Sequence, residues 1–301
     1  MTHQVWVAGE VLIDLILNKT DRKAIVGGGP ANTAKALAKL GISTQFIDGI
    51  STDQYGLMAK GELLKAGVKL DYVKYSDRST CLAMVSLDQI GNAIYEFIIE
   101  NTATFDYTLD WLPDPKIDNP SLLHIGTLAT AIEPGASVLF SWAQSVAKVA
   151  PIVFDPNIRP TVMSDCEQYV VQVERWVAIS SAIKVSDEDL KWLYPSLEID
   201  RVVNNWLTKG PSLIVVTYGE KGLAGYRVGE KVRVDAVKVA VTDTVGSGDT
   251  VGAILVEAIV NDGLDNLIGA RLGTMLKRAA KAAAITVSRS GATPPTLKEI
   301  D

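Results

Sequence analysis

The stretch that decides the fold is Asp243-Thr244-Val245-Gly246-Ser247-Gly248-Asp249, which the apolar run 250–260 follows directly. The β-branched residues 237–242 precede it, so the order predicts a strand, a glycine turn and a buried helix. The backbone N–H groups of Gly246–Gly248 would lie unpaired at the helix N-terminus, where the helix dipole favours an anion. Asp249 would repel a bound phosphate, so its carboxylate suits proton abstraction, as in phosphoryl transfer to a hydroxyl. An ordinary turn in which Asp249 only complements the helix dipole would have the same sequence.

The composition is that of one large globular unit. The chain has 301 residues, of which 48% are hydrophobic and 21% charged. This length fits a single domain over 1–301 better than two equal domains. The net charge of −6, without a basic block, argues against a nucleic acid or an anionic membrane as partner. Cys81 and Cys166 form no metal or redox spacing, and no signal peptide or membrane-spanning run is present, so we expect a cytoplasmic protein.

A second glycine cluster, Val26-Gly27-Gly28-Gly29-Pro30-Ala31-Asn32, opens a predicted helix over 33–40. Its glycines allow a close approach of the backbone to a ligand, and Asn32 offers both a donor and an acceptor. A turn without a ligand would look the same. Asp14 stands in the apolar run 11–17, where burial is costly unless the carboxylate accepts hydrogen bonds. It either points outward from an edge strand or binds ligand hydroxyls.

Strand and helix patterns alternate along the rest of the chain, which predicts an α/β fold. Strands are expected at 5–9, 43–49, 70–74, 122–125, 152–154, 183–185 and 212–217, and helices at 53–66, 134–149, 250–261 and 264–285. Two hairpins interrupt the order, 80–87 with 93–99 and 223–227 with 232–237. The first hairpin, with its turn at 88–92, predicts a small lid that pairs with 11–17. Lids exclude water from phosphoryl transfer, although such an insertion can also be decoration.

Polar residues gather where three predicted strands end. The three segments are Asp155-Pro156-Asn157-Ile158-Arg159, Ser186-Asp187-Glu188-Asp189 and Thr217-Tyr218-Gly219-Glu220-Lys221-Gly222. Open α/β sheets bind ligands at this edge. The acids at 187–189 either stabilise a helix start or hold Mg²⁺ through water. Neither His3 nor His124 has a partner at metal-ligand or triad spacing.

Both glycine motifs, with the intervening segments in this order, resemble the ribokinase-like (PfkB) carbohydrate kinases, and most closely the fructokinase and 2-keto-3-deoxygluconate kinase branch. The resemblance covers essentially the whole chain. It implies a ribokinase-like three-layer sandwich with a mostly parallel central sheet and a β lid from about 11–24 and 77–101. The implied activity is ATP-dependent transfer of the γ-phosphoryl group to a hydroxyl of a small sugar, with fructose the first choice. It also implies Mg²⁺, K⁺ as a further option, and a homodimer through the lid.

The resemblance also implies a role for each matching position. Asp249 would be the catalytic base, and the amides of Gly246, Ser247 and Gly248 the anion hole. The sugar would contact Asp14, Gly27, Gly28, Asn32, Ile99, Asn157 and Arg159. The nucleotide would contact Ser186, Thr217, Gly219, Gly222 and Ala280. Mg²⁺ would lie near Asp189 and Glu188, through water, and a monovalent cation near Asp243, Val245, Thr286, Arg289 and Gly291.

Three positions depart from the family pattern. Asp189 stands where the family's Asn-x-x-Glu motif has its glutamate, and Pro295 stands where a serine can bind the monovalent cation. Ile99 replaces an arginine that this branch often carries, which weakens the case for an anionic keto-acid substrate. A ribose, nucleoside or 2-keto-3-deoxygluconate kinase of the same family remains open, as does a sensor without catalysis. A dinucleotide-binding dehydrogenase is disfavoured, because Asp249 would face the pyrophosphate of its cofactor. A P-loop enzyme is excluded, because no Gly-Lys-Ser/Thr follows a glycine loop.

Overall fold

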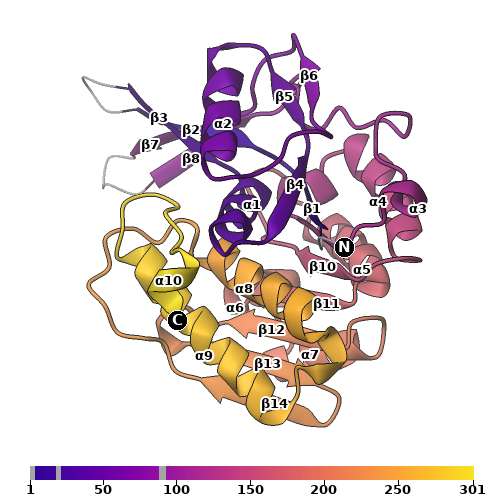
Figure 1. Ribbon diagram of the computed structural model, residues 1–301, viewed down its shortest axis with the longest axis vertical. Coiled ribbons are helices and arrows are strands. Elements are labelled where there is room, and N and C mark those ends of the chain that lie inside the picture. The colour runs from indigo at the N-terminus through magenta and orange to yellow at the C-terminus, as the bar shows by residue number, and fades with distance from the viewer. Residues whose placement is uncertain (1–3, 18–21, 88–92) are drawn as a thin grey trace.

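The centre of the protein is an eight-stranded, mostly parallel sheet. The computed structural model describes residues 4–17, 22–87 and 93–301. The strands run in the order β14-β13-β12-β11-β10-β9-β1-β4 (Figure 1). Six are parallel: β1 (Gln4–Ala8), β4 (Ser43–Ile47), β9 (Leu122–Gly126), β10 (Ile152–Asp155), β11 (Ala182–Ser186) and β12 (Leu213–Thr217). Antiparallel β13 (Leu223–Arg227) and β14 (Glu230–Val234) complete one edge.

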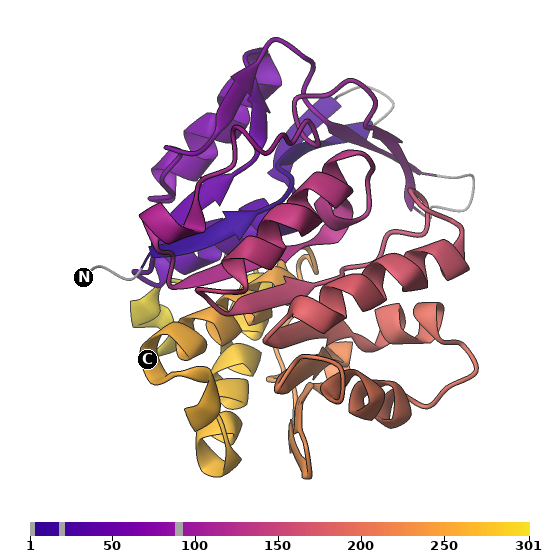
Figure 2. The ribbon, with the colours of Figure 1, turned by 90° about the vertical axis from the view of Figure 1, so that its right-hand side faces the viewer.

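Helices cover both faces of this sheet and make the three predicted layers (Figures 1 and 2). One face carries α4 (Gly135–Val146), α5 (Cys166–Ile179), α6 (Asp187–Leu193) and α7 (Ile199–Leu207). The other carries α1 (Gly29–Lys39), α2 (Gln54–Lys65), α8 (Ser247–Asp262), α9 (Gly269–Val287) and α10 (Leu297–Ile300). Side chains alternate along a strand, so Trp6 and Ala8 of β1 enter the first core, whereas Val5 and Val7 enter the second. Among the described residues, no helix is both long and apolar enough to cross a membrane.

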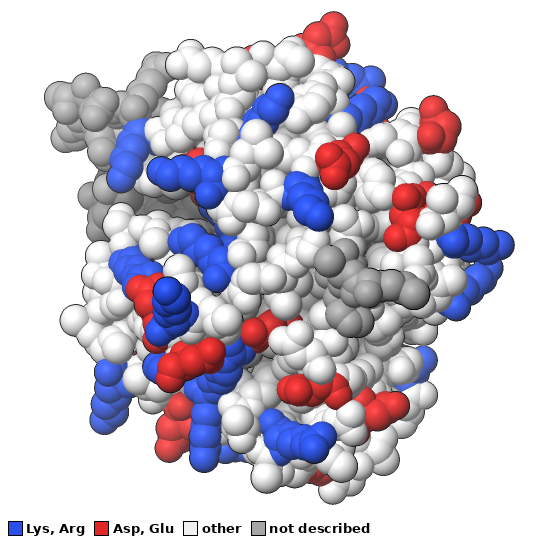
Figure 3. Space-filling view, viewed as in Figure 1, with Lys and Arg blue, Asp and Glu red and all other residues white. Residues whose placement is uncertain are grey.

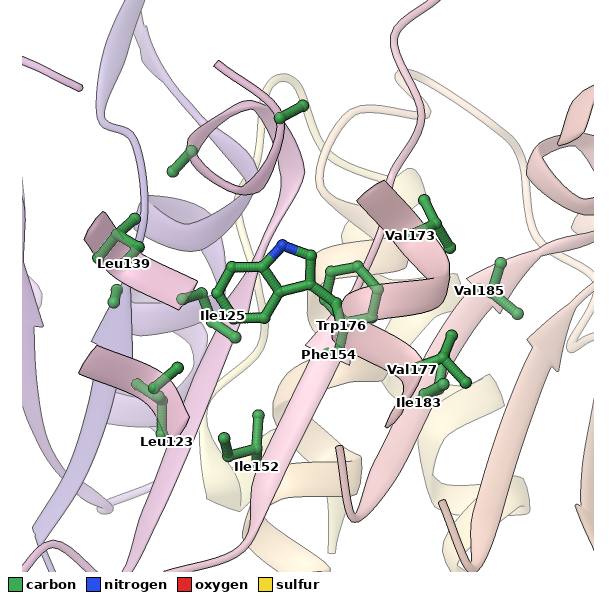
Figure 4. Packing of buried hydrophobic residues seen from close by; sticks show 14 of the residues in the cluster. Leu123, Ile125, Leu139, Ile152, Phe154, Val173, Trp176, Val177, Ile183 and Val185 are labelled. Carbon is green, nitrogen blue, oxygen red and sulfur yellow. The ribbon is translucent and has the colours of Figure 1, made fainter. Parts of the chain in front are cut away.

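The hydrophobic core beneath α5 supports the ends of β10 and β11, where several polar residues stand. Trp176 of α5 is 1% exposed and packs on Phe154 of β10, with ring centroids 5.9 Å apart (Figure 4). Ile183 and Val185 of β11 lie beside them. Removing a buried aromatic ring of this size costs about 3–5 kcal/mol. This packing therefore gives the ends of β10 and β11 a rigid base.

A four-stranded sheet stands apart from the central one at the upper left of Figure 1. Its strands are β3 (Arg22–Gly27), β2 (Leu12–Leu17), β7 (Leu82–Leu87) and β8 (Ala93–Ile98), in that order. β2 pairs in parallel with β7, which confirms the predicted pairing of 11–17 with the hairpin. The predicted turn at 88–92 lies outside the described residues, as does His3. That 1–301 form a single domain stays a prediction.

Several predicted elements are wrong in type or in bounds. Residues 237–242 form no strand, because β14 ends at Val234 and the segment crosses to α9, where Thr242 N bonds to Val287 O. The strand predicted at 70–74 is a turn followed by β6 (Lys74–Ser76), which pairs with β5 (Gly49–Ser51). The helix predicted at 264–285 is α9, which begins at Gly269, after the short 3₁₀ turn Leu264–Asn266. The predicted order also lacked two helices, α5 and α7, and the short helices α3 (Pro115–Asp118) and α10.

Candidate active site

The site lies where the direction of the sheet order reverses. From β1 the chain first goes to β4 on one side and later returns to β9 on the other. Such a switch point leaves a crevice at the carboxyl ends of the strands, which is where open α/β sheets bind ligands. The segments after β1, β9, β10 and β11 meet here, together with the N-termini of α1 and α8.

The glycine turn before α8 has the geometry that the sequence predicts. Gly246 has φ of 80°, the left-handed conformation that favours glycine, and it is the N-cap of α8. No side chain caps this helix, and Ser247 N donates to Thr244 O at the long distance of 3.4 Å. Ser247 and Gly248 line a cavity. An N-terminus of this kind offers amides and a positive dipole end to an anion.

The carboxyl group of Asp249 is buried in the first turn of α8, with an exposed fraction of 8%. Asn32 Nδ2 of α1 donates to Asp249 Oδ2 at 2.9 Å. Burial raises the pKa of Asp249 to about 6, although the charge of Lys184 and the bond from Asn32 oppose the rise. A carboxylate with this pKa is ionised at neutral pH and holds a proton more strongly than an ordinary aspartate. Both properties suit a general base.

A buried ion pair beside the glycine turn was not predicted from the sequence. Lys184 Nζ of β11 lies 2.9 Å from Asp155 Oδ2 of β10, with exposed fractions of 4% and 2%. A Cβ added to Gly248 would lie 2.7 Å from this ammonium, so the lysine adjoins the anion-binding amides. Burial would lower the pKa of Lys184, but Asp155 and Asp249 outweigh it and raise the pKa above its ordinary value. The signal was a lysine between Ile183 and Val185 in a buried strand, where a charge needs a partner.

A cavity of about 1120 Å³ opens from this point toward α9 and the segment after β14. All five residues predicted for the nucleotide line it: Ser186, Thr217, Gly219, Gly222 and Ala280. Asn157, Arg159, Glu188 and Asp189 line its inner end. The outer walls are apolar, with Val237, Val239 and Val287 among them. A volume of this order accommodates a ligand of nucleotide size.

The predicted sugar residues lie on the side of Asp249 that faces the lid. A Cβ on Gly29 would lie 3.0 Å from Asn157 Nδ2 and 3.4 Å from Asp249 Oδ1, so β10, α1 and α8 meet at one point. Gly27 borders Asp14, because a Cβ on it would overlap Asp14 Oδ2 at 2.3 Å. Burial raises the pKa of Asp14 to about 6, against the charges of Arg159 and Lys35.

Two further predicted sugar contacts, Gly28 and Ile99, have other neighbours. Gly28 adopts φ of 102°, and a Cβ on it would lie 2.4 Å from Glu10 O. Ile99 packs against the core cluster on the α4 and α5 side. The structure therefore brings Gly28 to the end of β1 and does not line the cavity with Ile99.

A second group that sequence reasoning missed is a pair of buried acids behind the sugar side. Glu10, 2% exposed, accepts hydrogen bonds from Thr127 Oγ1 and, at 3.2 Å, from Ala129 N. Burial raises its pKa to about 7. Asp48 accepts from Val11 N at 2.8 Å and from Tyr107 Oη at 2.9 Å, and burial raises its pKa well above the ordinary value. These bonds fix the turn that connects β1 to β2.

At the acidic start of α6, both carboxylate oxygens of Asp189 accept hydrogen bonds, whereas the carboxylate of Glu188 is exposed. Asp189 Oδ2 accepts from Ser186 N at 3.3 Å, while Ser186 Oγ accepts from Asp189 N at 2.9 Å, a capping box. Asp189 Oδ1 accepts from Ile158 N at 3.0 Å. Glu188 is exposed and faces the cavity. Within the described parts of the chain, no three His, Cys, Asp or Glu side chains cluster as a metal site.

The residues predicted for a monovalent cation come together beside Gly246. Asp243 Oδ1 accepts from Val245 N at 3.0 Å, and Asp243 Oδ2 accepts from Gly291 N at 2.9 Å. Thr286 and Arg289 flank this contact at the end of α9.

A buried carboxylate base, an uncapped helix N-terminus, a buried lysine and a cavity of nucleotide size surround one point. This combination supports phosphoryl transfer to a hydroxyl, so the fold and the site define a small-molecule kinase.

Comparison with known proteins identifies the family. The chain belongs to the PfkB carbohydrate kinases, because a family model described as "pfkB family carbohydrate kinase" matches residues 2–299. A fructokinase of Rhizobium leguminosarum bv. trifolii is 35% identical over 266 residues, which cover 85% of this chain and 79% of the relative. The structure of a Xylella fastidiosa fructokinase with bound ATP has a TM-score of 0.91 at 23% identity, covering 100% of this chain and 97% of the other.

A third relative was solved with ligands. An engineered double mutant of Vibrio cholerae fructokinase, with fructose, ADP and a potassium ion bound, has a TM-score of 0.85 at 24% identity, covering 97% and 94% of the two chains. These findings confirm the predicted ribokinase-like fold and the predicted class, an ATP-dependent sugar kinase.

Proposed function

We propose that this kinase phosphorylates fructose, taking the γ-phosphoryl group of ATP. The observation that carries the proposal is the carboxyl group of Asp249, held by Asn32 at the uncapped start of α8 and next to the ammonium of Lys184. The names of the relatives, fructokinases at 35% and 29% identity, support fructose as the acceptor.

The sugar lies between Asp14 and Asp249 in this proposal. Asp249 takes the proton of the attacking hydroxyl, while Asp14, Asn32 and the backbone of Gly27 and Gly28 hold the other hydroxyl groups. Asn157 borders the same point. Neutral hydroxyls need only hydrogen-bond partners, and carboxylate and amide groups supply them.

The nucleotide occupies the large cavity, with its base toward Ala280 and its phosphates toward Ser186, Gly219 and Gly222. The γ-phosphoryl group then reaches the amides of Gly246, Ser247 and Gly248. Lys184 stands at these amides and adds a positive charge that needs no rearrangement during the reaction. Fixed donors and charges of this kind stabilise the charge that develops in phosphoryl transfer.

Mg²⁺ would enter with the ATP phosphates. The ion keeps most of its waters and takes few protein ligands, so one open carboxylate near the phosphates is enough. Glu188 meets this requirement better than Asp189, whose two oxygens already accept backbone amides. The ion would neutralise phosphate charge there, and water would connect it to Glu188.

A neutral sugar fits the charges of the sugar side better than a keto-acid does. Arg159 Nη1 donates to the carbonyl oxygens of Asn157 and Ile158, and its charge already acts on three carboxyl groups, those of Glu10, Asp14 and Asp249. A substrate carboxylate would have to share this guanidinium with those carboxyl groups, and an uncompensated buried charge is costly.

The test is kcat/KM for fructose, ribose and 2-keto-3-deoxygluconate, measured side by side with ATP and Mg²⁺. We expect fructose to exceed both others. A keto-acid value tenfold or more above both neutral sugars would refute the choice of fructose and leave the kinase assignment intact. Absence of ATP consumption with any sugar or nucleoside would favour a sensor instead.

The assembly and the cellular location belong to the same proposal. We infer a homodimer through the lid sheet, whose β8 exposes 41% of Ile98, and a cytoplasmic protein without nucleic-acid or membrane partners. Light scattering on the purified chain and on Ile98→Glu tests the dimer. A monomeric mass for the unaltered chain would rule it out.

A further inference from the structure

The loop that connects α9 to α10, residues 288–296, packs directly against the turn of the anion hole. A Cβ added to Gly246 would lie 2.6 Å from the Cβ of Ala292. Asp243 joins the two segments, because its carboxylate accepts hydrogen bonds from Val245 N on one side and Gly291 N on the other. The position of this loop therefore sets the position of the amides at the start of α8.

Four of the oxygens that would bind a monovalent cation here already accept hydrogen bonds. Both oxygens of Asp243 accept amides, Gly291 O accepts from Thr293 N at 2.7 Å, and Thr286 O accepts from Arg289 N at 3.1 Å. Pro295 has no side-chain oxygen to contribute. A hard cation needs several free oxygen ligands at once, so the residues present do not fit the ion.

Fixed positive charges stand at the same loop instead. Lys39, at the end of α1, donates from Nζ to Pro294 O at 3.1 Å. Arg289 pairs with Glu299 of α10. Burial, and then the charges of Arg289 and Lys35, hold the pKa of Lys39 below its ordinary value, against the charge of Glu299. Figure 3 shows Lys and Arg side chains over α1, α9 and α10 on this face, with Asp and Glu side chains among them. A free cation entering beside Lys39 would be repelled by its ammonium.

We propose that Lys39, bonded to Pro294, and Asp243, bonded to Val245 and Gly291, hold this loop without a bound monovalent cation, so that this kinase does not depend on K⁺. The inference concerns the loop and ATP binding, and only its activity arm rests on the proposed function. It distinguishes this chain from the Vibrio cholerae relative, whose structure contains a potassium ion.

The test compares KCl with tetramethylammonium chloride at equal ionic strength, using the unaltered chain. We expect the Kd for ATP by calorimetry and kcat/KM for fructose to agree within about twofold between the two salts. The melting temperature should be the same in both salts within the error. A tenfold tighter Kd for ATP in KCl, or a K⁺-dependent rise in melting temperature beyond the error, would overturn the proposal. Calorimetry and melting need no sugar, so a failure of the fructose assignment leaves them valid.

Lys39→Met tests the role of the ammonium. Losing a charge-assisted hydrogen bond at this loop should weaken ATP binding about tenfold, and by the same factor in KCl and in tetramethylammonium chloride. Lys298→Met, which removes an exposed charge of α10, is the matched control and should bind ATP normally. ATP binding by Lys39→Met equal to that of the control in both salts would contradict the role of Lys39. If Lys39→Met does not fold, the salt series on the unaltered chain still decides whether K⁺ is required, and Lys39→Arg, which keeps the charge, should behave as unaltered.

Discussion

The hydrogen bond from Asn32 to Asp249 should set the pH at which the kinase becomes active. The bond joins Asn32 Nδ2 to a carboxylate oxygen at 2.9 Å and is buried, so water cannot replace it at no cost. Asn32 donates to the ionised form of Asp249. Asn32→Ala therefore destabilises the ionised form and raises the pKa of the base.

The size of the shift follows from the energy of such a bond. A hydrogen bond to a charged group contributes about 1.5–3 kcal/mol. One pKa unit corresponds to about 1.4 kcal/mol, so the pKa should rise by about one to two units from its value of about 6. A protonated base cannot accept the hydroxyl proton. Activity is therefore lost as the pH falls through the pKa, and the variant loses it at a higher pH.

The assay is kcat/KM against pH, from about pH 5 to about pH 9, because this ratio reports the pKa of the free enzyme. The unaltered chain should reach half of its plateau near the pKa of about 6, and Asn32→Ala at about 7–8. Thr33→Val is the control, since Thr33 Oγ1 donates to the backbone carbonyl of Asp249 at 3.4 Å and not to its carboxylate. A higher KM for the sugar in Asn32→Ala would lower kcat/KM at every pH without moving the midpoint of the profile. An unmoved midpoint would refute the reasoning, as would a flat profile of the unaltered chain below neutral pH.

Three further substitutions test the other parts of the site. Asp249→Asn should lower kcat by about 10²–10⁴-fold with ATP affinity retained in calorimetry, and turnover within a few-fold of the unaltered rate would show that another group is the base. Asp14→Ala should weaken fructose binding much more than ATP binding, because ligand hydroxyls lose their acceptor; equal losses of both ligands would exclude a sugar contact. Lys184→Met should lower kcat about 10²–10³-fold and, because it leaves Asp155 buried alone, lower the free energy of unfolding by about 3–5 kcal/mol. The double variant Lys184→Met/Asp155→Leu should regain stability in urea unfolding but not activity, and regained activity would remove Lys184 from the mechanism.

The parts of this protein that the sequence predicts are those encoded locally. Gly246 adopts a left-handed conformation that glycine favours, and a carboxylate in the next turn is visible in the sequence itself. Buried parallel strands show as apolar runs, and their carboxyl ends carry the polar segments that form the cavity. Chain order then suffices to bring Ser186, Thr217 and Gly248 to one edge of the sheet.

The parts that the sequence did not predict depend on partners far away in the chain. Lys184 meets Asp155 across 29 residues, Tyr107 meets Asp48 across 59, and Thr127 meets Glu10 across 117. Strand order decides these pairs, and hydrophobic periodicity does not give strand order. Residues 237–242 show the converse, because their β-branched composition suits a strand but the segment leaves the sheet and reaches the end of α9, where Thr242 N bonds to Val287 O.

The buried charges of the site explain how one aspartate can serve as the base. Burial raises the pKa of Asp249, and the ammonium of Lys184, together with the hydrogen bond from Asn32, limits the rise to about 6, so the carboxylate is available at neutral pH. The same ammonium adjoins the amides that would receive the γ-phosphoryl group. A phosphoryl group that arrives there offsets part of the charge of Lys184, which raises the proton affinity of Asp249 when a proton must be taken up. Lys184 therefore couples the arrival of the phosphoryl group to the strength of the base, and Asp155 keeps the lysine charged and in place between the two events.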